Sequence, residues 1–175
     1  MPPASVRTRR LTAAALAVAV LSAYGCSLDG GSTLPPVTDP ATQTYDVSTG
    51  VTIANMTRVS EHLYTQDFVV GTGSTVAVGD SITVYYTGAL TGGFQFNRRV
   101  APGPVTAFRL DTLSVIKGWV GGIPGMRVGG KRKLVISPAL GYGFNTARDN
   151  AGNILIPSNS VLVFDVELVA KITGT

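Results

Sequence analysis

Apolar and polar residues alternate along several segments in the second half of the chain. The clearest are residues 81–87, 131–136 and 161–169. In the first of them, Ile82, Val84 and Tyr86 share one face, while Thr83 and Tyr85 occupy the other. Successive side chains of a β-strand point to opposite faces, so this period of two predicts half-buried strands.

A helical pattern is found only between residues 113 and 120. Gly121, Gly122 and Pro124 follow it and would end a helix. Earlier in the chain, two glycines at residues 92–93 turn it into another short apolar run. Several half-buried strands with one short helix predict an α+β domain built on an antiparallel sheet.

The N-terminus combines positive charge with an apolar run. Arg7, Arg9 and Arg10 precede residues 11–21, which are mostly Ala, Val and Leu. A secretory signal has this order of a basic end, an apolar stretch and small residues before the cleavage point. We therefore predict that residues 1–25 are a signal peptide and that the protein is exported. An uncleaved anchor helix is the alternative, although spanning a bilayer takes roughly 20 apolar residues.

Cys26 is the only cysteine of the chain, which excludes a disulfide framework and a multi-thiolate metal site. It directly follows the predicted signal peptide, where bacterial lipoproteins are acylated. Gly25 and Cys26 resemble the lipoprotein recognition sequence, whereas Ala23 and Tyr24 depart from it. We expect Cys26 to be lipidated and to tether the protein to a membrane; ordinary cleavage that leaves a free thiol is the alternative. Ser27 favours the outer membrane in a cell with two membranes.

The segment after this cysteine has the composition of a linker. Residues 26–50 are rich in Gly, Ser, Thr and Pro and show no apolar periodicity, so we expect them to be flexible. Residues 51–66 have a mixed pattern and are expected to be an N-terminal extension that could include a short edge strand. Residues 67–175 are then the folded domain.

Charge and histidine content exclude several classes of function. Most of the formal charge of +4 comes from Arg7, Arg9 and Arg10, and without them eleven basic residues face ten acidic ones. No basic stripe remains for binding nucleic acid. His62 is the only histidine and has no cluster of cysteines or carboxylates beside it, which excludes a histidine-dependent triad and a multi-histidine metal site. We expect any catalysis to proceed without a metal or a cofactor.

An ordered series of short motifs in residues 67–171 resembles the FKBP-type peptidyl-prolyl isomerases. The motifs are Val84-Tyr85-Tyr86-Thr87-Gly88, Phe96, Val115-Ile116-Lys117-Gly118-Trp119, Met126-Arg127-Val128-Gly129-Gly130-Lys131-Arg132, Ile136-Ser137-Pro138, Gly141-Tyr142-Gly143, Ile156-Pro157 and residues 162–168. Each motif alone is weak evidence, but their order and spacing together are specific. The resemblance implies an antiparallel five- to six-stranded sheet wrapped around one short helix, with an apolar pocket between them.

The resemblance also implies a set of pocket residues. The catalytic ones would be Tyr86, Phe96, Asn97, Ile116, Trp119 and Tyr142, and the substrate-binding ones Phe108, Val115, Ile156 and Phe164. Trp119 would form the floor, the backbone N–H of Ile116 would meet a substrate carbonyl, and the Tyr142 hydroxyl would donate a hydrogen bond. Taken singly, aromatic residues in strands more often belong to a core.

Two residues depart from the family's pattern. Asn97 stands where an aspartate is common, so it keeps a polar group and loses the charge. Thr106 stands where the family often has an aromatic residue. In addition, residues 144–153 form a loop that is several residues longer than in the minimal domain, which could extend the surface that meets a protein substrate.

The function implied by the resemblance is cis-trans isomerisation of X–Pro bonds in exported proteins. The expected partners are proline-containing polypeptides, macrolide inhibitors and, through Cys26, a membrane. Asn97 and Thr106 leave open a chaperone or protein-binding module of the same fold with negligible catalysis. A lipid-anchored scaffold of unrelated function is a third hypothesis.

Overall fold

The computed structural model describes residues 36–172 apart from Pro104. The predicted signal peptide, Cys26 and the first part of the predicted linker lie outside the described residues. The strands are β1 (Thr57–Ser60), β2 (Leu63–Val69), β3 (Ser81–Leu90), β4 (Gln95–Arg99), β5 (Thr106–Arg109), β6 (Lys131–Ile136), β7 (Ala147–Arg148), β8 (Ile154–Ile156) and β9 (Leu162–Ile172). The helices are α1 (Lys117–Gly122) and the 3-10 turns η1 (Pro40–Thr42), η2 (Val47–Thr49), η3 (Ile53–Asn55) and η4 (Pro138–Leu140).

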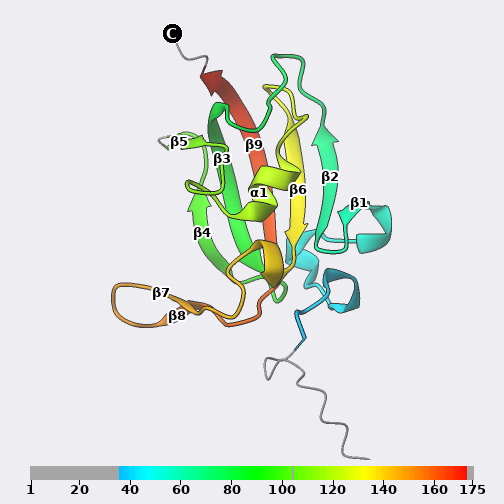
Figure 1. Cartoon of the computed structure of the whole chain (residues 1–175), viewed down its shortest axis with the longest axis vertical. Helices are drawn as coiled ribbons and strands as arrows, with labels where there is room; N and C mark the ends of the chain where they lie inside the picture. Colours follow the sequence, from blue (N-terminus) through cyan, green and yellow to red (C-terminus); the bar gives the residue numbers. More distant parts are fainter. Residues whose placement is uncertain (1–35, 104, 173–175) are drawn as a thin grey trace, which may run out of the picture. The chain divides into compact units, whose positions relative to one another are not determined.

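One large antiparallel sheet organises the described residues. The strand order is β1-β2-β6-β9-β3-β4, and β5 also pairs with β3, next to β4. Helix α1 lies across one face of the sheet (Figure 1). The long central strands β3 and β9 pair from Ser81↔Ile172 to Leu90↔Leu162. The predicted α+β fold with an antiparallel sheet and one short helix is confirmed for the described residues. Their sheet has seven strands rather than five or six, because β1 and β2 come from the residues expected to be an extension and from the first residues of the domain.

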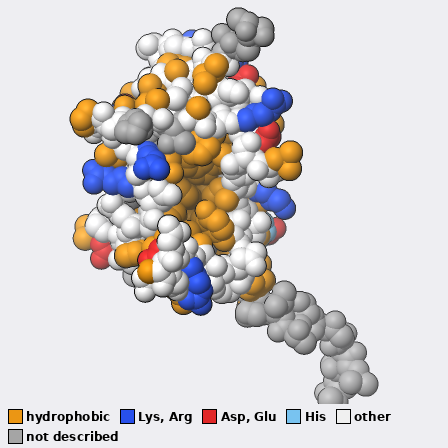
Figure 2. Space-filling model, turned by 90° about the vertical axis from the view of Figure 1, so that its left-hand side faces the viewer, with side chains coloured by type: hydrophobic (Ala, Val, Ile, Leu, Met, Phe, Trp, Pro, Cys, Tyr) orange, Lys and Arg blue, Asp and Glu red, His pale blue; other side chains and the backbone are white. Residues whose placement is uncertain are grey.

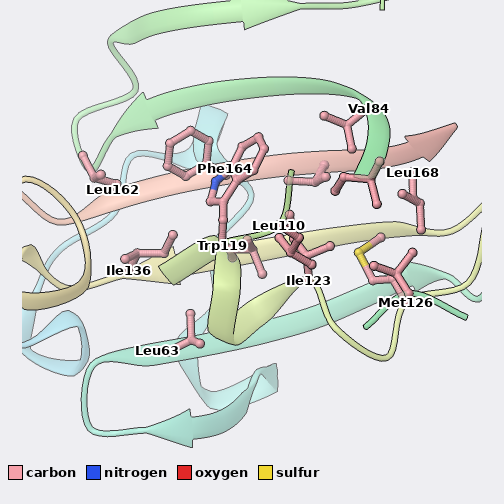
Figure 3. Packing of buried hydrophobic residues seen from close by; sticks show 14 of the residues in the cluster. Leu63, Val84, Leu110, Trp119, Ile123, Met126, Ile136, Leu162, Phe164 and Leu168 are labelled. Atoms are coloured by element: carbon pink, nitrogen blue, oxygen red, sulfur yellow. The ribbon is translucent and has the colours of Figure 1, made fainter. Parts of the chain in front are cut away.

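The face of the sheet beneath α1 carries the main hydrophobic core. Alternate side chains of β3, β6 and β9 point into it, as their period of two predicts. Figure 3 shows Trp119 and Ile123 descending from the helix and its C-terminal end onto this layer. The fully buried members include Leu63, Ile82, Val84, Leu110, Ile123, Leu134, Ile136, Leu162 and Leu168.

The opposite face of the sheet is covered in part by the segment that precedes β1. Tyr45, Val51, Ile53 and Met56 pack against a small cluster of sheet residues. These sheet residues are Tyr64, Val135, Val161 and Val163. The expectation of a flexible linker is therefore wrong for residues 36–50, and the domain includes both these residues and the extension. Widely spaced anchors in a Pro- and Thr-rich segment give no periodic signal, which explains the error.

Buried polar contacts fix this segment to the sheet. The Lys133 ammonium donates to the Thr49 carbonyl at 2.6 Å and pairs with Asp165, and its side chain is only 3% exposed. At the other end of the segment, the backbone N–H and the hydroxyl of Thr38 both donate to Asn159. A buried cation is costly unless it is paired and hydrogen-bonded, so Lys133 holds the segment in one arrangement.

Helix α1 is shorter than predicted and lies unusually close to the sheet. It begins at Lys117 rather than Leu113, because the preceding residues form a turn, and it ends at Gly122. A Cβ placed on Gly118 would lie 2.5 Å from Ile136, and one placed on Gly122 would lie 2.8 Å from Leu134. These glycines are four residues apart, so they share the face of the helix that meets β6.

We expect Gly118→Ala to lower the free energy of unfolding by about 1–3 kcal/mol, because the added methyl overpacks this contact. Gly121→Ala is the matched control on the same helix. Its Cβ would meet only the end of the Leu63 side chain, at 3.2 Å, and alanine has a higher helix propensity by up to about 1 kcal/mol. Urea unfolding of both variants measures the difference. Equal stability of the two would contradict a close contact between α1 and β6.

Candidate functional site

A cavity of about 590 Å³ opens between α1, the strands β3, β4, β5 and β9, and the loops around them. Figure 2 shows it as a hollow floored by hydrophobic side chains. Its wall residues are Tyr86, Phe96, Asn97, Phe108, Thr112, Leu113, Ser114, Val115, Ile116, Lys117, Trp119, Pro138, Ala139, Gly141, Tyr142, Gly143 and Phe164. The only charged side chain in this wall is that of Lys117.

Trp119 is the centre of an aromatic cluster. Its ring lies 5.2 Å from Tyr86, 5.4 Å from Phe108 and 5.4 Å from Phe164, each in an edge-to-face arrangement. Such geometry directs ring edges at ring faces and adds about 0.5–1.5 kcal/mol per pair beyond burial. The indole is 4% exposed, and its Nε1 has no hydrogen-bond partner among the described residues. A rigid apolar floor results.

Gly88 makes room for two of the aromatic walls. A Cβ at this position would lie 2.7 Å from the rings of both Phe96 and Phe164. These rings are themselves 5.6 Å apart in an edge-to-face pair. The glycine in the middle of β3 therefore lets β4 and β9 bring their phenylalanines together beside Trp119.

Few polar groups reach into this apolar cavity. The Tyr86 hydroxyl donates to Oδ1 of Asn97 at 3.3 Å. Burial raises the pKa of Tyr86, opposed by the positive charge of Arg99, so the phenol stays protonated at neutral pH. Neither the backbone N–H of Ile116 nor the Tyr142 hydroxyl is used in a hydrogen bond among the described residues, and Tyr142 is 40% exposed. Two donors are thus available to a ligand.

The structure brings nine of the ten predicted site residues to this cavity. They are Tyr86, Phe96, Asn97, Phe108, Val115, Ile116, Trp119, Tyr142 and Phe164. Ile156 does not line it: it lies in β8 opposite Ala147 and is buried in the main core. The side chain of Thr106 lies outside the described part of the structure.

Comparison with known proteins connects this geometry to a family. The sequence profile of the FKBP-type peptidyl-prolyl cis-trans isomerases matches residues 72–169, which is more than half of the chain. The chain belongs to this family. FK506-binding protein 2 of Dictyostelium discoideum is 47% identical over 91 residues, which cover 52% of this chain and 65% of that relative. A probable FKBP-type isomerase of Haemophilus influenzae is 41% identical over 99 residues, which cover 57% of this chain and 38% of that protein.

Solved structures of similar sequence share the fold of this FKBP domain. The crystal structure of AtFKBP13 matches with a TM-score of 0.57 and 40% identity, over 63% of this chain and 93% of that one. FkpA from Escherichia coli matches with a TM-score of 0.57 and 39% identity, over 67% and 51%. The similarity is therefore limited to the isomerase-type domain, and part of this chain and part of each solved structure lie outside the aligned region.

A tight turn that sequence reasoning missed forms one rim of the FKBP cavity. Asp111 accepts hydrogen bonds from the backbone N–H groups of Leu113 and Ser114 and also pairs with Arg109 at 3.0 Å. Hydrogen bonding, above all with Ser114, holds the pKa of Asp111 below its ordinary value. The turn leaves Leu113 97% exposed at the rim. An aspartate whose carboxylate accepts from the backbone N–H groups two and three residues later is a known turn signal and could have predicted this rim.

A second rim is the loop that carries Tyr142. The N–H of Gly143 donates to Pro138 at 2.8 Å, and the carbonyl of Gly143 accepts from the backbone N–H of Asn159 at 2.9 Å. Because Asn159 also accepts hydrogen bonds from Thr38, it connects the N-terminal segment to the loop beside the cavity. Gly143 has a φ of +59°, a backbone conformation that residues with a Cβ rarely adopt.

Within the described part of the chain, no group of three or more His, Cys, Asp or Glu residues is arranged to hold a metal ion. No helix of that part is both long and apolar enough to cross a membrane.

We expect the Asp111 turn to be lost at acid pH. Its folded-state pKa is lowered, so its contribution is complete above the unfolded pKa of about 4 and disappears as the pH falls through the folded value. Amide hydrogen exchange of Leu113 and Ser114 should accelerate in that range, after correction for the intrinsic rates. Asp111→Ala should show the fast exchange at every pH, and Asp111→Asn, which keeps the acceptor, should restore part of the protection. Unchanged protection in Asp111→Ala would refute this role.

Proposed function

We propose that this protein catalyses cis-trans isomerisation of X–Pro bonds in exported polypeptides. The observation that carries the proposal is the apolar cavity with Trp119 as its floor and three aromatic rings set edge-to-face around it. A proline ring is compact, apolar and conformationally restricted, which suits such walls. Membership of the isomerase family supports the same conclusion.

The chemistry fits a site without nucleophile or cofactor. Rotation about the X–Pro bond loses amide resonance and faces a barrier of roughly 18–20 kcal/mol, so the uncatalysed reaction takes about 10–100 s. The twisted amide separates less charge than the planar one, and an apolar cavity therefore favours it relative to water. Stronger binding of the twisted form than of the planar form lowers the barrier without making a bond.

Two donors at the cavity would orient the substrate chain. The Ile116 backbone N–H, just before α1, would meet a carbonyl beside the proline, and the Tyr142 hydroxyl would bind a second one. Tyr86 is already engaged with Asn97, which fixes the orientation of the Tyr86 ring over Trp119. Holding the flanking carbonyls while the proline ring turns against Trp119 is the role that we assign to these groups.

A protein-binding or chaperone role with negligible catalysis is the second candidate. Asn97 favours it, since a neutral amide replaces the carboxylate common in the family. The exposed Leu113 and the β7–β8 hairpin beyond the cavity offer apolar contacts for an unfolded chain. FK506-type macrolides are further proposed ligands, on the strength of the names of the relatives.

The export and the membrane tether are also proposals. They rest on the basic and apolar N-terminus and on Cys26, all of which lie outside the described residues. Mass spectrometry of the mature protein tests them: we expect chain initiation at Cys26 with a lipid-sized mass increment. An unmodified peptide that includes Cys26 would refute the lipid anchor.

For catalysis, we expect the protein at micromolar concentration to accelerate isomerisation of an X–Pro peptide in a protease-coupled or NMR exchange assay. Tyr142→Phe should lower kcat/KM about two- to twelvefold, because it removes one hydrogen bond worth about 0.5–1.5 kcal/mol. Tyr85→Phe is the matched control, since its hydroxyl binds the Gly103 carbonyl outside the cavity. No acceleration above background would reject the isomerase proposal and favour the chaperone.

A further inference from the structure

Asn159 has an unusual backbone conformation in the turn between β8 and β9. Its φ is +57°, and among the described residues it is the only one other than glycine with a positive φ. Left-handed backbone is unfavourable for most residues with a Cβ, although asparagine tolerates it better than most. Such a conformation persists only where the surrounding contacts fix it.

All four polar groups of Asn159 form hydrogen bonds. Its backbone N–H donates to the Gly143 carbonyl at 2.9 Å. Its side-chain oxygen accepts from the backbone N–H of Thr38 at 3.2 Å, and its carbonyl accepts from the Thr38 hydroxyl at 3.0 Å. Its side-chain amide donates to the Pro36 carbonyl at 3.2 Å. One residue therefore joins the N-terminal segment to the loop that carries Tyr142.

The Tyr142 side chain has no comparable support of its own. Its hydroxyl forms no hydrogen bond with a described residue, and its ring belongs to no aromatic pair among these residues. Its position at the cavity therefore depends on the backbone that carries it. That backbone is held at Gly143 from two sides, by the Pro138 carbonyl and by the N–H of Asn159.

The segment that binds Asn159 is itself anchored. Pro40, two residues after Thr38, is fully buried, and its carbonyl accepts a hydrogen bond from the Tyr45 hydroxyl at 2.8 Å. Tyr45 packs in the small cluster on the face of the sheet away from the cavity. Figure 1 shows this segment at the end of the domain that also carries β7 and β8. The segment can therefore fix the orientation of Asn159.

We propose that Asn159 is a positioning residue for catalysis, and that Thr38 and Pro36 hold it in the orientation that presents Tyr142 to the substrate. This deepens the proposed function and rests on it. The N-terminal segment thereby fixes one of the two hydrogen-bond donors of the cavity. Thr38 and Pro36 lie outside residues 72–169, which match the family profile, so part of the catalytic geometry comes from residues beyond that match.

A double-mutant cycle with Tyr142→Phe tests the proposal. Thr38→Val removes the hydroxyl bond and should lower kcat/KM about two- to threefold. Asn159→Gly keeps the left-handed backbone but loses the side-chain bonds, and its loss should approach that of Tyr142→Phe. Asn159→Asp retains the acceptor for Thr38 and should restore part of the activity. In the Tyr142→Phe background each change should cost less than about 1.5-fold, because no hydroxyl remains to be positioned.

Thr42→Val is the matched control in the same segment. The Thr42 hydroxyl donates to the Asp39 carbonyl and not to Asn159, so kcat/KM should stay unchanged in both backgrounds. A purely structural role of Thr38 and Asn159 would lower activity equally with and without the Tyr142 hydroxyl. That result, or wild-type activity of Asn159→Gly, overturns the inference.

Amide hydrogen exchange keeps this decision separate from the proposed function. If no peptide is isomerised faster than background, the isomerase proposal fails, and the N–H of Asn159 then reports on the positioning. Thr38→Val should accelerate exchange of this amide at least about fivefold and shift the NMR signals of the Tyr142 ring. Thr42→Val should change neither. Unchanged exchange and unchanged ring signals in Thr38→Val would reject the positioning role.

Discussion

The close contact between helix α1 and strand β6 sets the geometry on which the site depends. Gly118 and Gly122 let the helix backbone approach Ile136 and Leu134 so closely that a Cβ atom at either glycine would clash with these side chains. One residue after Gly118, Trp119 points from the helix into the apolar layer. The distance between the helix and the sheet therefore determines the position of the Trp119 indole at the floor of the cavity. A helix raised by one methyl group would lift that floor and change the shape of the cavity.

The same principle applies at the opposite wall. Gly88 in β3 permits the rings of Phe96 and Phe164 to meet, and Tyr86 on the same strand completes the cluster around Trp119. Glycines at points of closest approach thus decide where large aromatic rings can stand. Because the rings pack edge-to-face in a dense interior, the cavity keeps its shape before a ligand arrives. A preformed apolar site suits a reaction whose barrier is lowered by shape and by the absence of water.

Much of this arrangement could be predicted from the sequence. Alternation located β6 exactly and the cores of β3 and β9, and the order of the family motifs identified nine of the cavity residues. What escaped prediction has physical causes. Within residues 36–50, Tyr45 and Thr49 contact the sheet at irregular intervals, so composition alone made this segment look like a linker. Ile156 pairs with Ala147 in the β7–β8 hairpin and is buried in the core, which the Ile-Pro motif alone did not indicate. The turn held by Asp111 depends on backbone hydrogen bonds that a residue-by-residue comparison of motifs does not consider.

The N-terminal segment also changes the view of the domain's boundary. Lys133 is buried against the Thr49 carbonyl, and Thr38 binds Asn159, whose backbone supports the loop of Tyr142. The segment is therefore an integral part of the domain on the face away from the cavity and also reaches its rim. Studies of the isolated domain should begin no later than Pro36.

The central claim is that a proline ring binds against Trp119. Trp119 is the only tryptophan of the chain, so its fluorescence reports on the floor of the cavity without interference from another indole. A titration should compare a proline peptide with the same peptide carrying alanine in place of proline. The account predicts a saturable change in emission with the proline peptide and none with the alanine peptide. Equal changes with both peptides, or binding of the proline peptide without any change in emission, would contradict it.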